Sequence, residues 1–351
     1  MAAAPSGTHA SDLAASFRFF ASATAARGGL LYSYLLQRIA EDVETGGRFV
    51  DLLAPFRDEP RSGLMPLRLM SEVHRRVLDG ELPELAAHYP SAGGTLGPEG
   101  AWPPFREACL REAAELQEAL KRPHQHNEVA RSGAILTGLD FIAHETGMPL
   151  RLLEVGASAG LLLRSDRYRD AWWMPELFAK PSPLRLALRV VERRGCDPLP
   201  IDPASDDGRM RLRAMVWADL VEHMRMIDYA IDVCRQVPAR VDQADGADWL
   251  PERLSEAQPG AVSVVFHSMM VDLCSEASLS RMGAVLQSEA ACASVDAPLA
   301  WLRFEPSVRV DALQAPPTVE LRLSLWPGGD DRVLAVADTN GKGVKWLLES
   351  L

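Results

Sequence analysis

The sequence is poor in cysteine, and its cysteines are not spaced for cross-linking or metal binding. Five cysteines occur among 351 residues, an odd number, and no two of them form a C-x-x-C pair. Disulfide frameworks and zinc knuckles both depend on paired cysteines at such spacings. We therefore expect a protein of a reducing compartment, the cytoplasm.

Long apolar runs and an excess of basic charge are also missing. No segment approaches the roughly 18 uninterrupted apolar residues of a membrane-spanning helix, and the first residues, MAAAPSGTHASDLAAS, lack the basic start and apolar stretch of a signal peptide. The formal net charge of −11 disfavours a broad surface for nucleic acid. We therefore expect no membrane or nucleic-acid partner, and a small-molecule substrate or another protein is the better candidate.

Helical periodicity fills the first part of the chain. From about residue 11 to residue 148, apolar residues recur at intervals of three and four, and stretches dense in proline and glycine, such as PFRDEPRSG, separate the periodic segments. No strand pattern is convincing in this region. We predict a helical domain over 11–148, preceded by a disordered terminus over 1–10.

The pattern changes after Pro149 to short apolar runs that alternate with amphipathic stretches, which is typical of an α/β sheet. Two late runs, TVELRLSLW and RVLAVAD, are joined by PGGDD and predict an antiparallel hairpin. We predict an α/β domain over 149–351 with a Rossmann-like sheet of seven strands, the last two forming this C-terminal hairpin. The other predicted strands span residues 151–155, 185–191, 239–242, 262–267 and 298–304.

The first predicted strand lies in RLLEVGASAG, which carries two motifs at once. Glu154, Gly156 and Gly160 form the glycine turn of a nucleotide-type cofactor site, where small residues let a ligand approach the backbone. Residues 156–160 also spell G-x-S-x-G, the elbow of a serine hydrolase with Ser158 as nucleophile. That fold places strands before the elbow and a histidine after its last strand, but the last histidine here is His267, in the fourth predicted strand. The cofactor interpretation is therefore favoured, and a serine hydrolase is an alternative.

At these residues the chain resembles the class I S-adenosylmethionine-dependent methyltransferases, whose first motif is an acidic residue followed by glycines, here Glu154, Gly156 and Gly160. Ser158 stands where many of these enzymes have glycine. The resemblance implies a sheet with an antiparallel C-terminal hairpin, S-adenosylmethionine as cofactor, and methyl transfer to an acceptor. The full chain is also similar to the DUF2332 family of uncharacterised bacterial proteins, through NEVARSGAIL, LLEVGASAGL, ERRGCDPLPID and VVFHS.

The methyltransferase resemblance also implies further site residues. Asp197, after the second predicted strand, would accept hydrogen bonds from the ribose hydroxyls. Asp245 would accept one from the adenine amino group, and Gly246 would let the backbone approach the ring. His267, followed by Ser268 at the end of the fourth predicted strand, would face the methyl acceptor and serve as its general base.

Topology places two more residues near this site. Glu305 follows the fifth predicted strand, at the same sheet edge as His267. Asn127 belongs to the segment before the first motif, which often closes the site in methyltransferases, although it also suits a helix cap. The neighbouring His124 and His126 are spaced i, i+2 and do not share a helical face, so we predict no metal site.

Structural roles remain open for the same residues. His267 could be a buried strand histidine satisfied by the backbone, and Glu154, Asp197 and Asp245 could cap turns. The motif FHSMM also departs from the acidic or Asn-Pro-Pro patterns of nitrogen methylators. A non-catalytic ligand-binding or regulatory protein on the same fold is therefore a further alternative.

Overall fold

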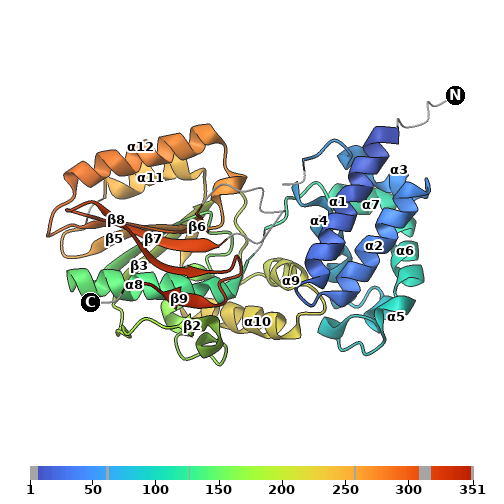
Figure 1. The fold of residues 1–351 in the computed structure, drawn as a ribbon, viewed down its shortest axis with the longest axis horizontal. Helices are drawn as coiled ribbons and strands as arrows, with labels where there is room; N and C mark the ends of the chain where they lie inside the picture. Colours follow the sequence, from blue (N-terminus) through green and yellow to red (C-terminus); the bar gives the residue numbers. More distant parts are fainter. Residues whose placement is uncertain (1–6, 61–62, 126, 257, 308–317, 349–351) are drawn as a thin grey trace. The chain divides into compact units, whose positions relative to one another are not determined.

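The computed structural model describes residues 7–60, 63–125, 127–256, 258–307 and 318–348 (Figure 1). The chain divides into two compact units. The helical unit consists of Met1–His126 and Ser205–Asp228, and the sheet unit consists of Asn127–Ala204 and Tyr229–Leu351. The chain therefore leaves the helical unit, begins the sheet, returns to the helical unit and then completes the sheet.

Amphipathic helices surround one apolar core in the helical unit. This core includes the fully buried side chains of Phe17, Leu35, Phe49, Leu69 and Phe105. The intervals of three and four residues between apolar positions place such side chains on one face of each helix. The helices are α1 (Gly7–Ala25), α2 (Leu30–Glu44), α3 (Phe49–Leu53), α4 (Met65–Leu78), α5 (Pro83–Ala86), α6 (Trp102–Arg111), α7 (Ala113–Ala119), α9 (Asp206–Ala214) and the first part of α10 (Val221–Gln236).

A polar contact ties the returning segment Ser205–Asp228 to the rest of the helical unit. Asp219 accepts hydrogen bonds from the backbone N–H groups of Leu31, at 2.9 Å, and Tyr32, at 3.4 Å. These groups lie at the start of α2. The N-cap residue of α2 is Gly29, which has no side chain that could cap the helix. Asp219 thus supplies the acceptor that the first turn of a helix requires.

The boundary between the units differs from the predicted domain boundary at residue 148. Helix α8 (Ser132–Thr146) closes the predicted helical domain, but its Ile135, Leu139 and Ile142 side chains belong to the core of the sheet unit. Apolar spacing identifies a helix without indicating which core the helix joins. Of the predicted disordered terminus, residues 7–10 belong to α1, and residues 1–6 lie outside the described part of the chain.

One mixed sheet forms the centre of the sheet unit. Its nine strands, counted over the described residues, are β1 (Leu150–Val155), β2 (Phe178–Lys180), β3 (Val190–Asp197), β4 (Arg240–Gln243), β5 (Val262–Ser268), β6 (Leu299–Pro306), β7 (Val319–Trp326), β8 (Asp330–Ala337) and β9 (Val344–Trp346). They lie in the order β2-β9-β8-β7-β6-β5-β1-β3-β4. Strands β4, β3, β1, β5 and β6 are parallel, the pairs from β6 to β9 are antiparallel, and β2 is parallel to β9.

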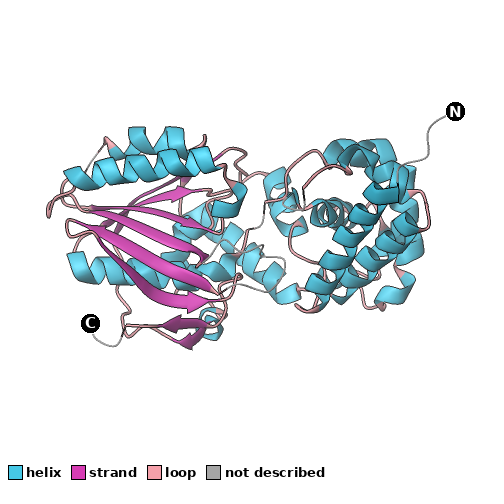
Figure 2. Ribbon diagram, turned by 45° about the horizontal axis from the view of Figure 1, so that its top comes forward, coloured by secondary structure: helices cyan, strands magenta, loops and turns pink. Residues whose placement is uncertain are grey.

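Helices cover both faces of this sheet (Figures 1 and 2). Helix α8 lies on one face, while α11 (Gly246–Leu254) and α12 (Glu276–Cys292) lie on the other. Parallel strands with helices on both faces are buried from both sides, and β1 is buried along its whole length. In the described residues no helix is both long enough and apolar enough to cross a membrane.

The mixed α/β class, the helical first part and the antiparallel C-terminal strands are confirmed, but the prediction of seven strands is wrong. The sheet has two further strands, β2 and β9, of three residues each. The second predicted strand is also displaced. The alternating pattern suggests a strand at residues 185–191, and the structure has it at Val190–Asp197. Charged residues are accommodated in β3, since Arg193 pairs with Asp166 and Arg194 pairs with Asp242.

The direction of strand addition reverses at β1. The chain builds β3 and β4 to one side of β1 and then β5 and β6 to the other. Open α/β sheets bind ligands outside the carboxyl ends of their strands at such a switch point. The turn after β1 leads into a 3-10 helix, η6 (Leu162–Tyr168), whereas the cofactor motif predicts an α-helix there.

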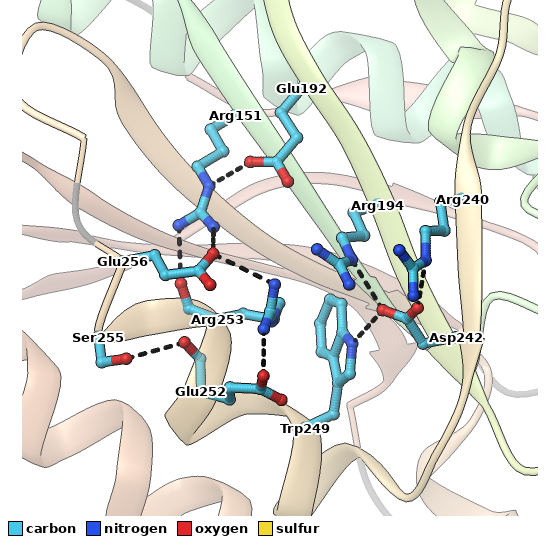
Figure 3. Close-up of polar contacts among 10 residues, drawn as sticks. All are labelled: Arg151, Glu192, Arg194, Arg240, Asp242, Trp249, Glu252, Arg253, Ser255 and Glu256. Atoms are coloured by element: carbon cyan, nitrogen blue, oxygen red, sulfur yellow. Dashed lines mark hydrogen bonds and ion pairs between the residues drawn. The ribbon is translucent and has the colours of Figure 1, made fainter.

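A buried ion-pair network around Arg151 joins the strands to α11 (Figure 3). Arg151 of β1 is fully buried, and its Nε donates to Glu192 of β3 at 2.5 Å. Its Nη1 donates to the carbonyl of Arg253 in α11 at 2.9 Å, and its Nη2 lies 3.5 Å from a carboxylate oxygen of Glu256. A buried guanidinium is tolerated only when its donors are satisfied in this way.

A second set of polar contacts holds the edge strand β4 (Figure 3). Asp242 accepts hydrogen bonds from Arg194 of β3 at 2.7 Å, from Arg240 at 2.6 Å, and from the indole N–H of Trp249 at 2.8 Å. Partial burial would raise the pKa of Asp242, but the bonds from Arg194 and Trp249 outweigh burial and lower it to about 2. The carboxylate therefore stays ionised and joins β3, β4 and α11.

Candidate functional site

The turn after β1 has an unusual backbone. Gly156, Ser158 and Gly160 have φ angles of 71°, 49° and 66°. Glycine adopts such angles without strain, whereas serine does so rarely. The N–H groups of Gly156 and Ala157 donate to the carbonyl of Cys196 at 2.9 and 3.0 Å, and the N–H of Gly160 donates to the carbonyl of Ala157 at 2.7 Å. The turn is therefore fixed against the carboxyl end of β3.

Asp197 holds this turn from the end of β3. One of its carboxylate oxygens accepts a hydrogen bond from the N–H of Ser158 at 2.9 Å, and the other accepts from the N–H of Leu199 at 2.8 Å. The N–H of Ile201 donates in turn to the carbonyl of Ser158 at 3.2 Å. These bonds compensate for the left-handed conformation of Ser158. The predicted ribose-binding carboxylate thus lies directly beside the predicted glycine turn.

Glu154 is a buried carboxyl that is only partly satisfied at this sheet edge. Its side chain is only 3% exposed, and its Oε2 atom has no hydrogen-bond partner among the described residues. Burial raises the pKa of Glu154 well above its usual value, the charge of Arg164 opposes this shift, and the charge of Asp197 adds to it. A backbone hydrogen bond with Leu163 also opposes the shift, so one oxygen alone is unsatisfied, and a buried oxygen in that state needs a functional or structural explanation.

His267 and Glu305 form a buried pair at the ends of β5 and β6. His267 is 2% exposed, and its Nδ1 lies 2.7 Å from Oε1 of Glu305. The same oxygen accepts a hydrogen bond from the N–H of Met270 at 3.0 Å. A carboxylate at Nδ1 favours the tautomer with the proton on Nδ1, which leaves the lone pair on Nε2. Beside His267, the Oγ of Ser268 is buried and has no partner within the described chain.

The segment before α8 contributes the remaining residues of the site. Asn127 donates a hydrogen bond from Nδ2 to the Oγ of Ser158 at 3.1 Å. The cap role considered for Asn127 belongs to Glu128, whose side chain accepts from the N–H of Ala130 at the start of η5 (Val129–Arg131). The predicted link between this segment and the glycine turn is therefore a direct side-chain contact.

Arg131 lies at the end of the same segment and is buried. Its Nε donates to the carbonyl of Thr339 at 3.0 Å. Burial lowers the pKa of Arg131, and the carboxylates of Glu128, Glu305 and Asp338 oppose this effect. The spacing i, i+3 of Glu128 and Arg131 suggests a surface ion pair, but both residues are buried.

Asp245 and Gly246 have structural roles at the end of β4. Asp245 is the N-cap of α11, where it accepts from the N–H of Ala247 at 2.8 Å, and it also accepts from the hydroxyl of Ser278 at 2.9 Å. Gly246 is buried, and an added Cβ would lie 2.5 Å from a methyl group of Val155. The close approach at Gly246 is therefore to the side chain of Val155.

Arg164 was not recognised in the sequence as part of this region. It is buried, its Nη1 donates to the carbonyl of Gly160 at 2.6 Å, and its Nε donates to the carbonyl of Val237 at 2.7 Å. The available signal was an isolated arginine after three leucines in GLLLR. A charge in an apolar run after a glycine turn indicates a buried, partnered side chain.

The structure thus gathers the predicted residues on neighbouring strands. The carboxyl ends of β1, β3, β5 and β6 carry Glu154, Asp197, His267 and Glu305, and Asn127 contacts Ser158 in the turn. No group of three histidine, cysteine or acidic side chains in the described part of the chain is arranged to hold a metal ion, and His126 lies outside that part.

A family model described as "Uncharacterized protein conserved in bacteria (DUF2332)" matches residues 14–346. The chain belongs to the DUF2332 family. No curated protein and no solved structure matches the chain.

Proposed function

We propose that this DUF2332 protein binds S-adenosylmethionine at the turn Gly156–Gly160 and transfers its methyl group to a small-molecule acceptor. The observation that carries the proposal is the unpartnered, buried oxygen of Glu154 at the switch point of the sheet. A carboxylate in that position suits a ligand that brings its own positive charge, and the amino group of the methionine moiety is such a charge.

The residues around Glu154 fit the rest of the cofactor. Gly156 is exposed and has no side chain to keep a ligand from the backbone. Asp197 is fixed in place by the N–H groups of Ser158 and Leu199, and each carboxylate oxygen can accept a second bond from a ribose hydroxyl. When bound, S-adenosylmethionine would supply a methyl group on a positively charged sulfur.

His267 is the residue that we assign to the acceptor. With Nδ1 directed at Glu305, its Nε2 can take the proton that an oxygen or nitrogen acceptor loses as its bond to the methyl carbon forms. The bound cofactor would supply the methyl group in the same step, and its sulfur would retain the electron pair of the broken bond to the methyl carbon. Burial of His267 excludes water from this proton transfer.

Calorimetric titration of the full chain with S-adenosylmethionine and S-adenosylhomocysteine tests the proposal. We expect both to bind, and we expect Glu154→Gln to weaken binding at least about tenfold, because a buried charge-assisted hydrogen bond is lost. Glu176→Gln, at an exposed site of the same unit, is the matched control and should bind as the wild type does. Absence of heat with the wild type, or equal affinity for the Glu154 variant, would refute the cofactor site.

Binding of the cofactor without turnover across a broad screen of acceptors would instead favour a non-catalytic protein of the same fold. In that case Glu154→Gln would still weaken binding of the cofactor. Titration measures binding of the cofactor and the acceptor screen measures methyl transfer, so the two experiments distinguish a non-catalytic protein from an enzyme.

A serine hydrolase is the second candidate, and two observations favour it. Ser158 has a positive φ in a sharp turn after a strand, and His267 forms a carboxylate pair on the adjacent strand β5. It ranks second because, among the described residues, the hydroxyl of Ser158 has Asn127 and no histidine as its side-chain partner, whereas a nucleophile must donate to a histidine. Labelling by a fluorophosphonate that disappears in Ser158→Ala would establish it.

A further inference from the structure

A small concavity in the helical unit is lined by an unusual number of arginines. Its volume is about 30 Å³, and it lies between α4, α9 and the segment after α7. We call it the arginine pocket, and its charged lining consists of Arg68, Glu72, Arg75, Arg122 and Arg211. Four guanidinium groups thus face one carboxylate, in a chain whose formal net charge is −11.

The carboxylates near the pocket leave part of this positive charge uncompensated. Arg68 pairs with Glu59, and Arg75 lies 3.2 Å from Asp79 and 3.8 Å from Glu72. Even so, the Nε atoms of Arg68 and Arg75 are buried and have no hydrogen-bond partner in the described part of the chain. Five other arginines of the described chain also have such an Nε atom, so what sets the pocket apart is that two of these atoms belong to one lining.

The other two arginines are still less engaged. Within the described ranges Arg122 makes no ion pair, and the hydrogen bond of Arg211 is to the side-chain amide of Gln125, at 3.4 Å. Both lie close enough to act on Glu72, since burial raises the pKa of Glu72 and the charges of Arg75, Arg122 and Arg211 oppose that shift. The guanidinium groups therefore converge on one place from three segments of the chain.

We propose that the arginine pocket binds a phosphate group, either as free phosphate or as the end of a phosphate monoester. Guanidinium groups match the oxygens of phosphate with paired N–H donors, and a dianion offsets more of the excess positive charge than a carboxylate does. The concavity has roughly the volume of one water molecule, so it would take in one or two phosphate oxygens and leave the rest of the ligand at its mouth. This site lies wholly within the helical unit and does not depend on the function proposed for the sheet unit.

Calorimetric titration of the full chain at low ionic strength tests this site, with inorganic phosphate, glycerol phosphate and acetate as probes. We expect both phosphate compounds to bind and acetate to bind more weakly. Arg122→Gln and Arg211→Gln should each weaken phosphate binding about tenfold or more, because each removes a charged donor. Arg57→Gln removes the same charge from an exposed site of the same unit and should have little effect.

Each other outcome overturns the proposal. Absence of heat at millimolar phosphate would show that the pocket is not a phosphate site. An equal loss in Arg57→Gln would show that phosphate responds only to overall charge, and tighter binding of acetate would indicate a carboxylate site. Thermal unfolding of each variant, compared with the wild type, separates loss of binding from loss of the fold.

Discussion

The carboxyl group of Glu154 lies where its ionisation costs free energy. Burial raises its pKa in the folded protein, so the folded state holds the proton more tightly than the unfolded state does. Stability linked to this group is therefore present below the unfolded pKa of about 4.3 and is lost as the pH rises above it.

The variant Glu154→Gln should reveal this penalty. The free energy of unfolding of this variant, minus that of the wild type, should be larger at pH 7.5 than at pH 4.5, because only the wild type carries an ionisable group at this position. Urea unfolding at the two pH values measures the difference, with Glu176→Gln as the exposed control. If the difference in free energy of unfolding between variant and wild type is the same at both pH values, Glu154 is not desolvated.

Asp242 should show the opposite dependence on pH. Its pKa of about 2 lies below the unfolded value, so its contribution is fully present above about pH 4 and is lost as the pH falls towards 2. The shift corresponds to about 2 kcal/mol. Asp242→Asn should therefore destabilise the protein by about 2 kcal/mol at pH 7. In urea unfolding, the difference in free energy of unfolding between variant and wild type should become smaller below pH 4. A difference that does not change with pH would contradict the lowered pKa of Asp242.

For single residues, the sequence predicts which side chains belong to the candidate site better than it predicts their contacts and burial. The sequence identifies Glu154, Asp197, His267 and Glu305, because acidic and histidine side chains at strand ends are visible in the pattern. The pairing of His267 with Glu305 could not be predicted, since it requires the order of β5 and β6 in the sheet. The buried position of Arg164 needed the turn geometry as well.

Among the elements, the turn after β1 has the strictest backbone requirement. At Gly156, φ is 71° and an added Cβ would lie 3.2 Å from the Cβ of Met270. Gly156→Ala should therefore lower the free energy of unfolding by about 1–2 kcal/mol. Gly283→Ala is the control, because this site is within α12 and has free space around it, and there alanine should stabilise by about 0.5–1 kcal/mol. Chemical denaturation measures both, and equal effects would contradict this account.

The network around Arg151 makes a prediction for the packing of α11 on the sheet. Arg151→Met would leave Glu192 without its buried partner, and we expect a loss of about 3–5 kcal/mol. Arg332→Met removes a half-exposed arginine that lies 3.0 Å from the exposed carboxylate of Asp330 and 3.8 Å from Glu145, and it should cost no more than about 1 kcal/mol. Similar losses from the two variants in urea unfolding would show that burial of Arg151 does not matter.

The predicted strands are wrong where the local alternation of apolar residues differs from the pairing of strands in the sheet. Residues 185–191 alternate as a strand does, yet β3 begins at Val190 and includes a charged run whose arginines find acidic partners. Strands β2 and β9 are three residues long and carry too little pattern to be recognised. Long, strongly patterned elements such as β7 and β8 were located correctly.

At the scale of the whole molecule, the chain path was the least predictable property. Segment Ser205–Asp228 interrupts the sheet unit and completes the helical unit, where Asp219 caps α2. Hydrophobic spacing reports that α8, α9 and α10 are amphipathic or buried, but it does not say which core each one joins. That assignment depends on contacts between residues far apart in the sequence.

Both units carry a proposed site of distinct chemistry, a carboxylate-rich sheet edge and an arginine-rich concavity. The sheet edge is central because it lies at the switch point and holds a buried carboxyl with one unpartnered oxygen. The most direct measurement is a crystal structure of the full chain grown with S-adenosylhomocysteine. We predict ligand density beside Gly156, with the amino group bonded to Glu154 and the ribose hydroxyls bonded to Asp197. Ligand bound elsewhere, or a saturating soak that leaves this edge without it, would contradict the account.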